Sequence, residues 1–263
     1  MTGASVGTDA TLITFEPMVD SQCARMLLDY YGLHWRERDH MLVAGSLAAL
    51  LRTGKVPLPV VYGKGFRIAS PRPMAEHFDA RVPEERRLIP APGPLREEVE
   101  ADWKLFNGGM GAWTAHFAYY HLMPERRLMT PVFRAPLRGL ERALVGPLYP
   151  VTNFVLKMGL KLSAERAEAA LASIRNAFDA TDRRIADGRP YLTGERITLG
   201  DFGLASATAA LVLPRGYKAT MPRLEDMPPA LKAVIEELRQ RPTAAFVERF
   251  YDERLRAVRL SAG

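Results

Sequence analysis

Arg189-Pro-Tyr-Leu-Thr-Gly-Glu-Arg-Ile-Thr-Leu-Gly-Asp-Phe-Gly-Leu-Ala205 is the stretch of this chain that decides the fold. Within it, Thr198 and Asp201 have the spacing of a capping box, with Asp in place of the usual Glu. The small, apolar run from Phe202 to Leu213 follows directly and has no polar stripe, which predicts a helix buried on all sides. The stretch therefore predicts a central helix and the residues that start it.

The sequence around this stretch predicts further helices and almost no strands. Residues 95–122 form one long helix or two, with a weak point at Asn107-Gly108-Gly109. Residues 163–187 have an apolar stripe, with Ser163 as the expected N-cap and Gly188 as the stop. The closing helix carries its apolar residues on one side: Val247, Phe250, Tyr251, Leu255 and Val258.

The first eighty residues alternate between short strand-like and helix-like segments. Strands are expected at 11–15, 33–38, 57–62 and 65–69, and helices at 21–31, at 46–52 and from Pro71 onward, with Ser70 as N-cap. This β-α-β-α-β-β-α order is that of the thioredoxin fold. The proline-rich residues 83–97 are typical of a linker. We therefore expect a thioredoxin-like domain at 10–82 and an all-helical domain at 98–263.

Composition limits the class of protein further. The chain has 263 residues, 48% of them hydrophobic, and a formal net charge of +6. Its basic residues are dispersed among nearly as many acids and no nucleic-acid-binding motif occurs, so no nucleic-acid partner is expected. Cys23 is the only cysteine, which excludes a disulfide within the chain and fits a reducing, cytoplasmic setting. Residues 1–10 lack the apolar core of a signal peptide.

A small mixed domain followed by an all-helical one resembles the glutathione S-transferase superfamily over roughly residues 11–255. Two segments carry the resemblance besides the layout: Arg189 to Ala205, and Gly54-Lys-Val-Pro-Leu-Pro-Val60. It implies glutathione as co-substrate, transfer of its thiolate to a hydrophobic electrophile, a role in detoxification, and a homodimer. A non-catalytic protein of the same fold, binding an apolar ligand or a protein partner, is the alternative.

The resemblance also implies which residues would bind glutathione. Val56 would pair through its backbone with the extended peptide, because the following Pro57 is expected in the cis form; Pro59 competes for that role. Ser70, at a helix N-terminus, would bind the γ-glutamyl carboxylate. Ala69 departs from the family pattern, which has an acidic residue or Gln just before the Ser.

The position of the residue that would activate the thiol is the second place where this chain departs from the family pattern. The family's Ser- and Cys-dependent classes carry a hydroxyl or thiol at the end of the first strand, and Met18 stands there. Ser21 is the candidate catalytic residue, one turn later, with capping of the first helix as its other role. Cys23 is expected to pack as a small apolar residue.

Candidates for the hydrophobic substrate pocket are Trp113, Phe117 and Tyr120, aromatic residues that equally suit a helical core. His116 and His121 lie five residues apart, off one helix face, so no metal site is expected. Residues 143–162 form an apolar stretch flanked by Arg138, Arg142, Lys157 and Lys161. Its most apolar run, Ala143 to Leu156, is too short and too broken by glycine and proline to span a bilayer, so residues 143–162 are either an extra packed segment or a contact with a membrane surface.

Overall fold

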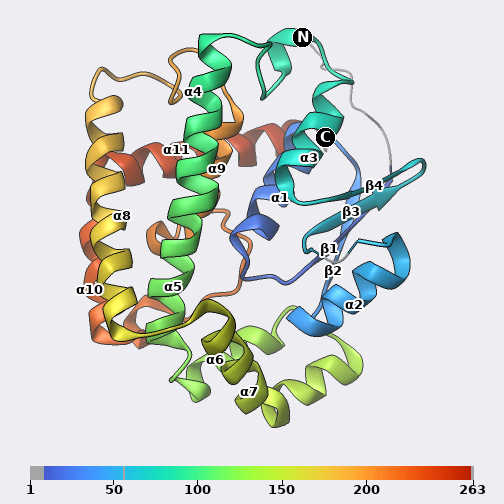
Figure 1. Cartoon of the computed structure of the whole chain (residues 1–263), viewed down its shortest axis with the longest axis vertical. Helices are drawn as coiled ribbons and strands as arrows, with labels where there is room; N and C mark the ends of the chain where they lie inside the picture. Colours follow the sequence, from blue (N-terminus) through green and yellow to red (C-terminus); the bar gives the residue numbers. More distant parts are fainter. Residues whose placement is uncertain (1–8, 56, 262–263) are drawn as a thin grey trace.

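The computed structural model describes residues 9–55 and 57–261, with side chains up to Glu253. Its N-terminal part is a four-stranded sheet with three helices (Figure 1). The strands are β1 (Ala10–Thr14), β2 (Trp35–Asp39), β3 (Val60–Gly63) and β4 (Phe66–Ala69), and the helices are α1 (Val19–Tyr30), α2 (Leu42–Thr53) and α3 (Pro71–Asp79). The predicted thioredoxin-like order is confirmed.

The fully buried strand β1 lies inside the sheet, whose order is β2-β1-β3-β4. It runs parallel to β2 and antiparallel to β3, and β3 runs antiparallel to β4. Helices α1 and α3 pack together on one face, and α2 covers the other (Figure 1). The end of β1, the start of α1 and the start of α3 thereby come to one side of the domain.

The rest of the chain is helical, as predicted. A continuous rod is formed by α4 (Pro94–Trp103), the π-helical segment η2 (Lys104–Met110) and α5 (Gly111–Leu122), so the weak point at Asn107-Gly108-Gly109 becomes a π-helix and not a break. The other elements are η1 (Glu84–Arg86), α6 (Arg126–Arg134), α7 (Gly139–Leu160), α8 (Ala164–Arg184), α9 (Leu199–Val212), η3 (Leu224–Asp226), α10 (Pro229–Leu238) and α11 (Pro242–Ser261).

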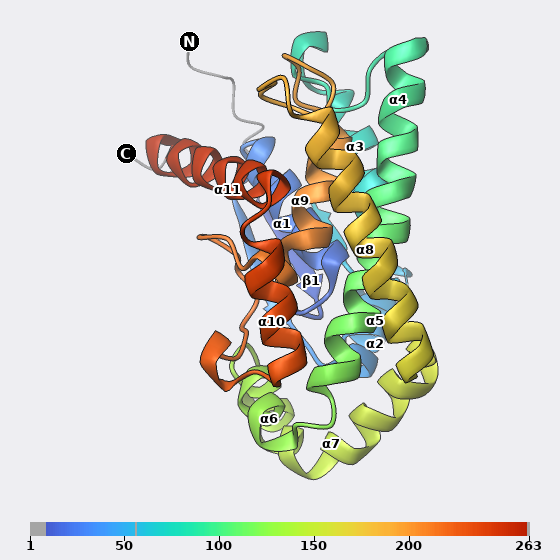
Figure 2. The ribbon, with the colours of Figure 1, turned by 90° about the vertical axis from the view of Figure 1, so that its left-hand side faces the viewer.

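Helix α9 is the centre of the molecule and begins at the predicted capping box. The Asp201 carboxylate accepts from the Thr198 N–H at 2.8 Å and from the Leu192 N–H at 2.8 Å. Every residue of α9 except Ala210 is buried, because α1, α4, α5, α10 and α11 all pack around it (Figure 2). The hydrogen bonds of Asp201 within residues 189–205 therefore fix the start of α9, and α9 contacts both parts of the chain.

The connection between the two parts is fixed by one buried acid. Asp79, at the end of α3, accepts the Leu88 N–H at 2.8 Å and the Ile89 N–H at 2.9 Å. The Leu88 carbonyl in turn accepts the Leu199 N–H at 2.9 Å, at the start of α9. The residues before α4 are thus held by hydrogen bonds from both sides.

Helices α6 and α7 form one end of the molecule, beside α2 (Figure 1). Two prolines, Pro147 and Pro150, stand inside α7, and each removes one helical hydrogen bond. The carbonyl of Gly146, which Pro150 cannot bond, accepts instead from Arg126 Nη2 at 3.0 Å. In the described part of the chain, none of the helices combines the length and the hydropathy needed to cross a membrane.

Candidate functional site

The turn between β1 and α1 carries no polar side chain at the helix start. The N-cap of α1 is Met18, so the prediction that Ser21 caps this helix is wrong. Ser21 lies in the first turn, fully buried, and its hydroxyl donates to the Phe15 carbonyl at 2.9 Å. Its role as the thiol-activating residue stays a prediction, and its surroundings favour a structural role.

Helix η2 fixes the start of α1 from the helical domain. Asn107 Nδ2 donates to Asp20 Oδ1 at 2.7 Å, and a Cβ on Gly111 would lie 3.3 Å from Val19 Cγ1. Burial raises the pKa of Asp20, partly offset by the Asn107 hydrogen bond. Cys23, one turn further, has a fully buried side chain, which agrees with its predicted packing role.

The start of β3 and the start of α3 meet at Pro59 and Ser70. The cis peptide bond in the described residues is Leu58–Pro59, so the competing proline has the cis form that was expected of Pro57, and its part in binding glutathione stays a prediction. Val56, and with it the bond to Pro57, lies outside the described residues; Pro57 itself is exposed. The Ser70 N–H donates to the Pro59 carbonyl at 3.0 Å and so joins the two segments.

Ser70 is the N-cap of α3 by position, but its hydroxyl makes no capping hydrogen bond. Its φ of 68° lies in the left-handed region, which is unfavourable for a residue with a Cβ. Strain of this kind persists where the surrounding structure holds it, and it concentrates at functional sites. Ser70 therefore presents an uncommitted hydroxyl from a strained backbone.

The N-terminus of α3 offers few other donors. Pro71 and Pro73 have no N–H, and the Met74 N–H is bonded to the Ser70 carbonyl at 3.3 Å. The Arg72 N–H is the backbone donor that remains in this first turn. An anion here would be held by one N–H and the Ser70 hydroxyl, which is a weaker site than an ordinary helix start.

The predicted pocket residues on α5 line neither of the two hollows described below. Phe117 is buried in the core, with its ring edge-on to His121 at 4.8 Å. Trp113 covers Gly109, and Tyr120 is partly buried against the same core. Their assignment to a substrate pocket stays a prediction.

An apolar groove of about 380 Å³ lies instead between α2 and α7. Its lining includes three well-buried side chains, Phe15, Val145 and Leu156, which form the floor. The walls come from both helices: Met41, Leu42, Val43, Ala44, Leu47, Leu144, Leu148, Val151, Thr152 and Val155. Phe15 directly precedes the β1–α1 turn, so the groove adjoins the turn that carries Met18, where the resemblance led us to expect the thiol-activating residue.

Glu141 is the charged residue of this groove and ties α7 to the start of α2. Its Oε1 lies 2.7 Å from His40 Nδ1, and its Oε2 accepts the Met41 N–H at 2.9 Å. Met41 is the N-cap of α2, where a carboxylate is favoured by the helix dipole. Sequence analysis missed the groove, and the signal on α2 was the apolar run Leu42 to Ala44 with Leu47 one turn later.

A buried ion cluster lies behind the β1–α1 turn. The Arg25 guanidinium, 1% exposed, is bonded to Glu37 at 2.7 Å and lies 3.7 Å from Asp39. Burial, with the neighbouring Glu37 charge, raises the pKa of Asp39 to about 6. Burial likewise raises the pKa of Glu16, whose Oε1 accepts from the Thr220 hydroxyl at 3.2 Å. The cluster holds more acids than bases and stiffens the turn.

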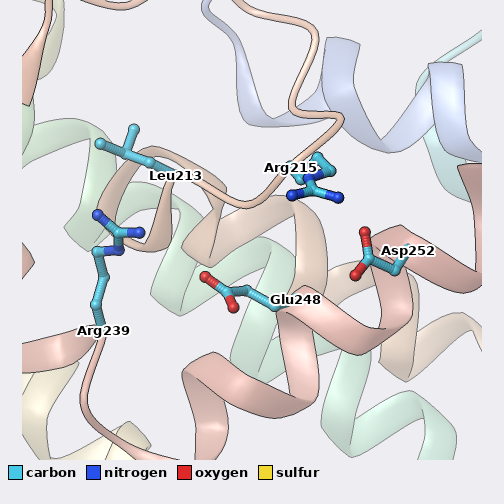
Figure 3. A pocket seen from close by; sticks show the side chains of 5 residues that line it. All are labelled: Leu213, Arg215, Arg239, Glu248 and Asp252. Atoms are coloured by element: carbon cyan, nitrogen blue, oxygen red, sulfur yellow. The ribbon is translucent and has the colours of Figure 1, made fainter.

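A second, polar hollow lies on the helical domain, lined by two arginines, two acids and Leu213 (Figure 3). Its lining is Leu213, Arg215, Arg239, Glu248 and Asp252. The charges balance, and all four charged residues come from the end of the chain beyond α9. Within residues 9–55 and 57–261, no group of three or more His, Cys, Asp or Glu is arranged to hold a metal ion.

Comparison with known proteins agrees with this geometry. Residues 164–237, which include α8 and α9, match the family described as "Glutathione S-transferase, C-terminal domain". A search of curated protein sequences gives no significant match.

Solved structures with the same fold span nearly the whole chain. A glutathione S-transferase from Xanthobacter autotrophicus aligns at 15% identity, over 91% of each chain, with a TM-score of 0.56. One from Methylobacillus flagellatus, with glutathione bound, aligns at 13% identity, over 96% of this chain and 98% of that one, with a TM-score of 0.55. FzlA from C. crescentus aligns at 16% identity, over 91% of each chain, with a TM-score of 0.53. At these identities the likeness is one of fold.

Proposed function

We propose that this chain, whose residues 164–237 match the glutathione S-transferase C-terminal domain and whose fold is that of glutathione S-transferases, binds glutathione on its N-terminal domain and an apolar compound in the α2–α7 groove. The observation that carries the proposal is Ser70. It combines a left-handed backbone, a side chain without a capping bond and direct contact with Pro59, at the position where the family binds glutathione.

The chemistry that follows is thiol transfer. The glutathione thiolate forms a bond to an electrophilic carbon of the apolar compound, and the leaving group departs with its electron pair. Met18 supplies no hydroxyl, so we assign stabilisation of the thiolate to the backbone N–H groups of the first turn of α1, which have no side-chain cap. The groove floor at Phe15 would hold the compound beside this turn.

The second candidate is a binding protein that keeps the groove without the chemistry. Met18 at the N-cap of α1 and the two prolines in the first turn of α3 favour it, because both reduce the donors available to glutathione. The two candidates differ in one measurable respect, which is turnover when both ligands are bound.

The test of the groove uses Ala44, a lining residue, and Ala112, an exposed residue of α5 outside the groove. Ala44→Trp fills the groove, and Ala112→Trp is the matched control. We expect Ala44→Trp to weaken binding of an apolar fluorescent probe at least tenfold while glutathione affinity is unchanged. Equal probe binding by both variants would rule out the groove.

Conjugation of glutathione to a chloronitrobenzene then separates the two candidates. Thiol transfer predicts a rate above the uncatalysed one that Ala44→Trp lowers and Ala112→Trp leaves intact. No rate enhancement, with both ligands shown to bind, would leave the binding protein as the function.

A further inference from the structure

One end of the molecule exposes an extended apolar surface. Among the described residues, the large apolar side chains that are exposed lie on α2 and α7, with Leu105 as the exception. On α2 they are Val43, Leu47, Leu50 and Leu51; on α7 they are Leu140, Leu144, Leu148, Val151, Phe154, Val155 and Met158. Soluble proteins rarely expose so many large apolar side chains together, and a patch of this kind marks an interaction site. We name these eleven side chains the apolar face.

Helix α7 presents most of its circumference to solvent. Only Val145, Tyr149 and Leu156 are buried, and they form one narrow stripe. Its other exposed apolar side chains either line the groove with α2, at Leu144, Leu148, Val151 and Val155, or lie outside it, at Leu140, Pro147, Pro150, Phe154 and Met158. With 22 residues, α7 is about 33 Å long. An apolar helix of this length, exposed on several sides, can lie in the plane of a bilayer surface with its apolar side chains in the acyl boundary.

The charge around the apolar face is mainly positive. Residues 123–162 contain seven Lys and Arg and only two Asp and Glu, in a chain whose net charge is +6. Four of the bases are exposed and stand at the two ends of α7: Arg138, Arg142, Lys157 and Lys161. No ion pair between these four and an acid occurs in the part of the chain that the structure describes.

The acid on α7 does not offset this charge. Glu141 faces the start of α2, where it is bonded to His40 and to the Met41 N–H. The outward side of α7 therefore combines apolar side chains along its length with unpaired cations at both ends. Cations so placed can contact lipid phosphates while the apolar residues between them enter the acyl boundary.

We propose that the apolar face, with the bases at both ends of α7, docks the protein on the surface of an anionic lipid bilayer. The helix lies in the plane of the interface and does not cross it. Figure 1 shows α6 and α7 together at one end of the molecule, beside α2, so docking would leave the remainder of the chain in water. The proposal does not depend on glutathione binding.

Vesicle co-sedimentation of the full chain tests this proposal, with phosphatidylserine and phosphatidylcholine mixed or with phosphatidylcholine alone. We expect binding to the anionic vesicles at low salt, at least tenfold weaker binding at high salt, and weaker binding to the neutral vesicles. Absence of binding to the anionic vesicles at low salt would overturn the proposal, as would equal binding to both kinds.

Two variants assign the binding to this surface. Leu51, Phe154 and Met158 are 78%, 65% and 61% exposed and do not line the groove, so Leu51→Ser, Phe154→Ser and Met158→Ser together should leave the thermal midpoint unchanged. We expect this triple variant to lose at least about a hundredfold in vesicle affinity. The control is Leu105→Ser, which should bind like wild type. Equal binding by the triple variant would contradict the proposal.

The variant that tests the charge combines Arg138→Glu with Lys157→Glu. Its matched control combines Lys104→Glu with Arg183→Glu, because these two bases are exposed but lie on other helices. The first should lower affinity for anionic vesicles by more than tenfold relative to the second, since both change the net charge equally. Sedimentation equilibrium tests the other possible occupant of the apolar face, which is a second copy of this chain. A dimer that the triple serine variant converts to monomer, with no vesicle binding by wild type, would assign the face to a second copy and overturn the proposal.

Discussion

Burial decides what the Ser21 hydroxyl can do. The side chain is fully buried and donates to the Phe15 carbonyl inside the β1–α1 turn. We predict that Ser21→Ala lowers the free energy of unfolding by about 1 kcal/mol, through loss of one buried hydrogen bond. Conjugation kinetics should remain within twofold of wild type. Lost activity at an unchanged stability would instead assign catalysis to Ser21.

Asp39 makes stability depend on pH. Its pKa is raised from 3.8 to about 6, so the folded state favours the protonated carboxyl. The stability that the protonated Asp39 carboxyl contributes is complete below about pH 4 and is lost as the pH rises through about 6. Asp39→Asn should therefore raise the free energy of unfolding at pH 7 by up to about 2 kcal/mol and flatten its pH dependence between about 4 and 7.

Denaturant unfolding at several pH values measures this effect, and Glu37→Gln is the control of opposite sign. Glu37 holds the buried Arg25 guanidinium at 2.7 Å, and its loss should destabilise the fold by about 3 kcal/mol. An Asp39→Asn variant that is less stable than wild type at pH 7 would contradict this account of the cluster.

At single residues, sequence reasoning succeeded where the chemistry is local. Thr198 with Asp201, and Ser163 as N-cap of α8, follow from side chains that bond their own helix start. The prediction that Ser21 caps α1 failed, because the N-cap is Met18, whose side chain cannot make the capping hydrogen bond that marks a helix start in a sequence. The sequence left Pro57 and Pro59 as alternatives for the cis form, and the structure has it at Pro59.

Helix packing explains why a glycine stands at residue 200. A Cβ there would lie 2.8 Å from Asp102 Cβ, at the crossing of α9 and α4. We predict that Gly200→Ala lowers the thermal midpoint and costs at least about 2 kcal/mol, since both helices are rigid. The matched variant is Gly159→Ala in α7, where nothing lies within 4 Å and Ala should stabilise by about 0.5 kcal/mol. Two variants of equal stability would contradict the packing argument.

Elements were predictable where their pattern is repeated over several turns. The sequence indicated the order of strands and helices along the N-terminal part and the apolar stripe of α8. It also indicated a weak point near Asn107, which the structure shows as a π-helical segment. Helix α7 was harder, because Pro147 and Pro150 interrupt its pattern and because apolar periodicity does not tell a buried side from an exposed one. The groove between α2 and α7 depends on that packing, and so it emerged only from the structure.

A homodimer is what the resemblance to glutathione S-transferases implies, and no contact described above bears on it. We predict a homodimer, with a mass of twice the 29.3 kDa chain in sedimentation equilibrium. The mass should stay the same in the triple serine variant of the apolar face, because that face is assigned to lipid. A single species with the mass of one chain at all concentrations would contradict the prediction.

Glutathione binding is the claim on which the proposed function depends, and titration calorimetry of the full chain with reduced glutathione tests it most directly. The account predicts a saturable heat with a submillimolar Kd, weakened about tenfold by Ser70→Gly, which removes the hydroxyl and relaxes the left-handed backbone. Folded wild-type protein that takes up no heat from millimolar glutathione would contradict it, and so would an unchanged Kd in the Ser70→Gly variant.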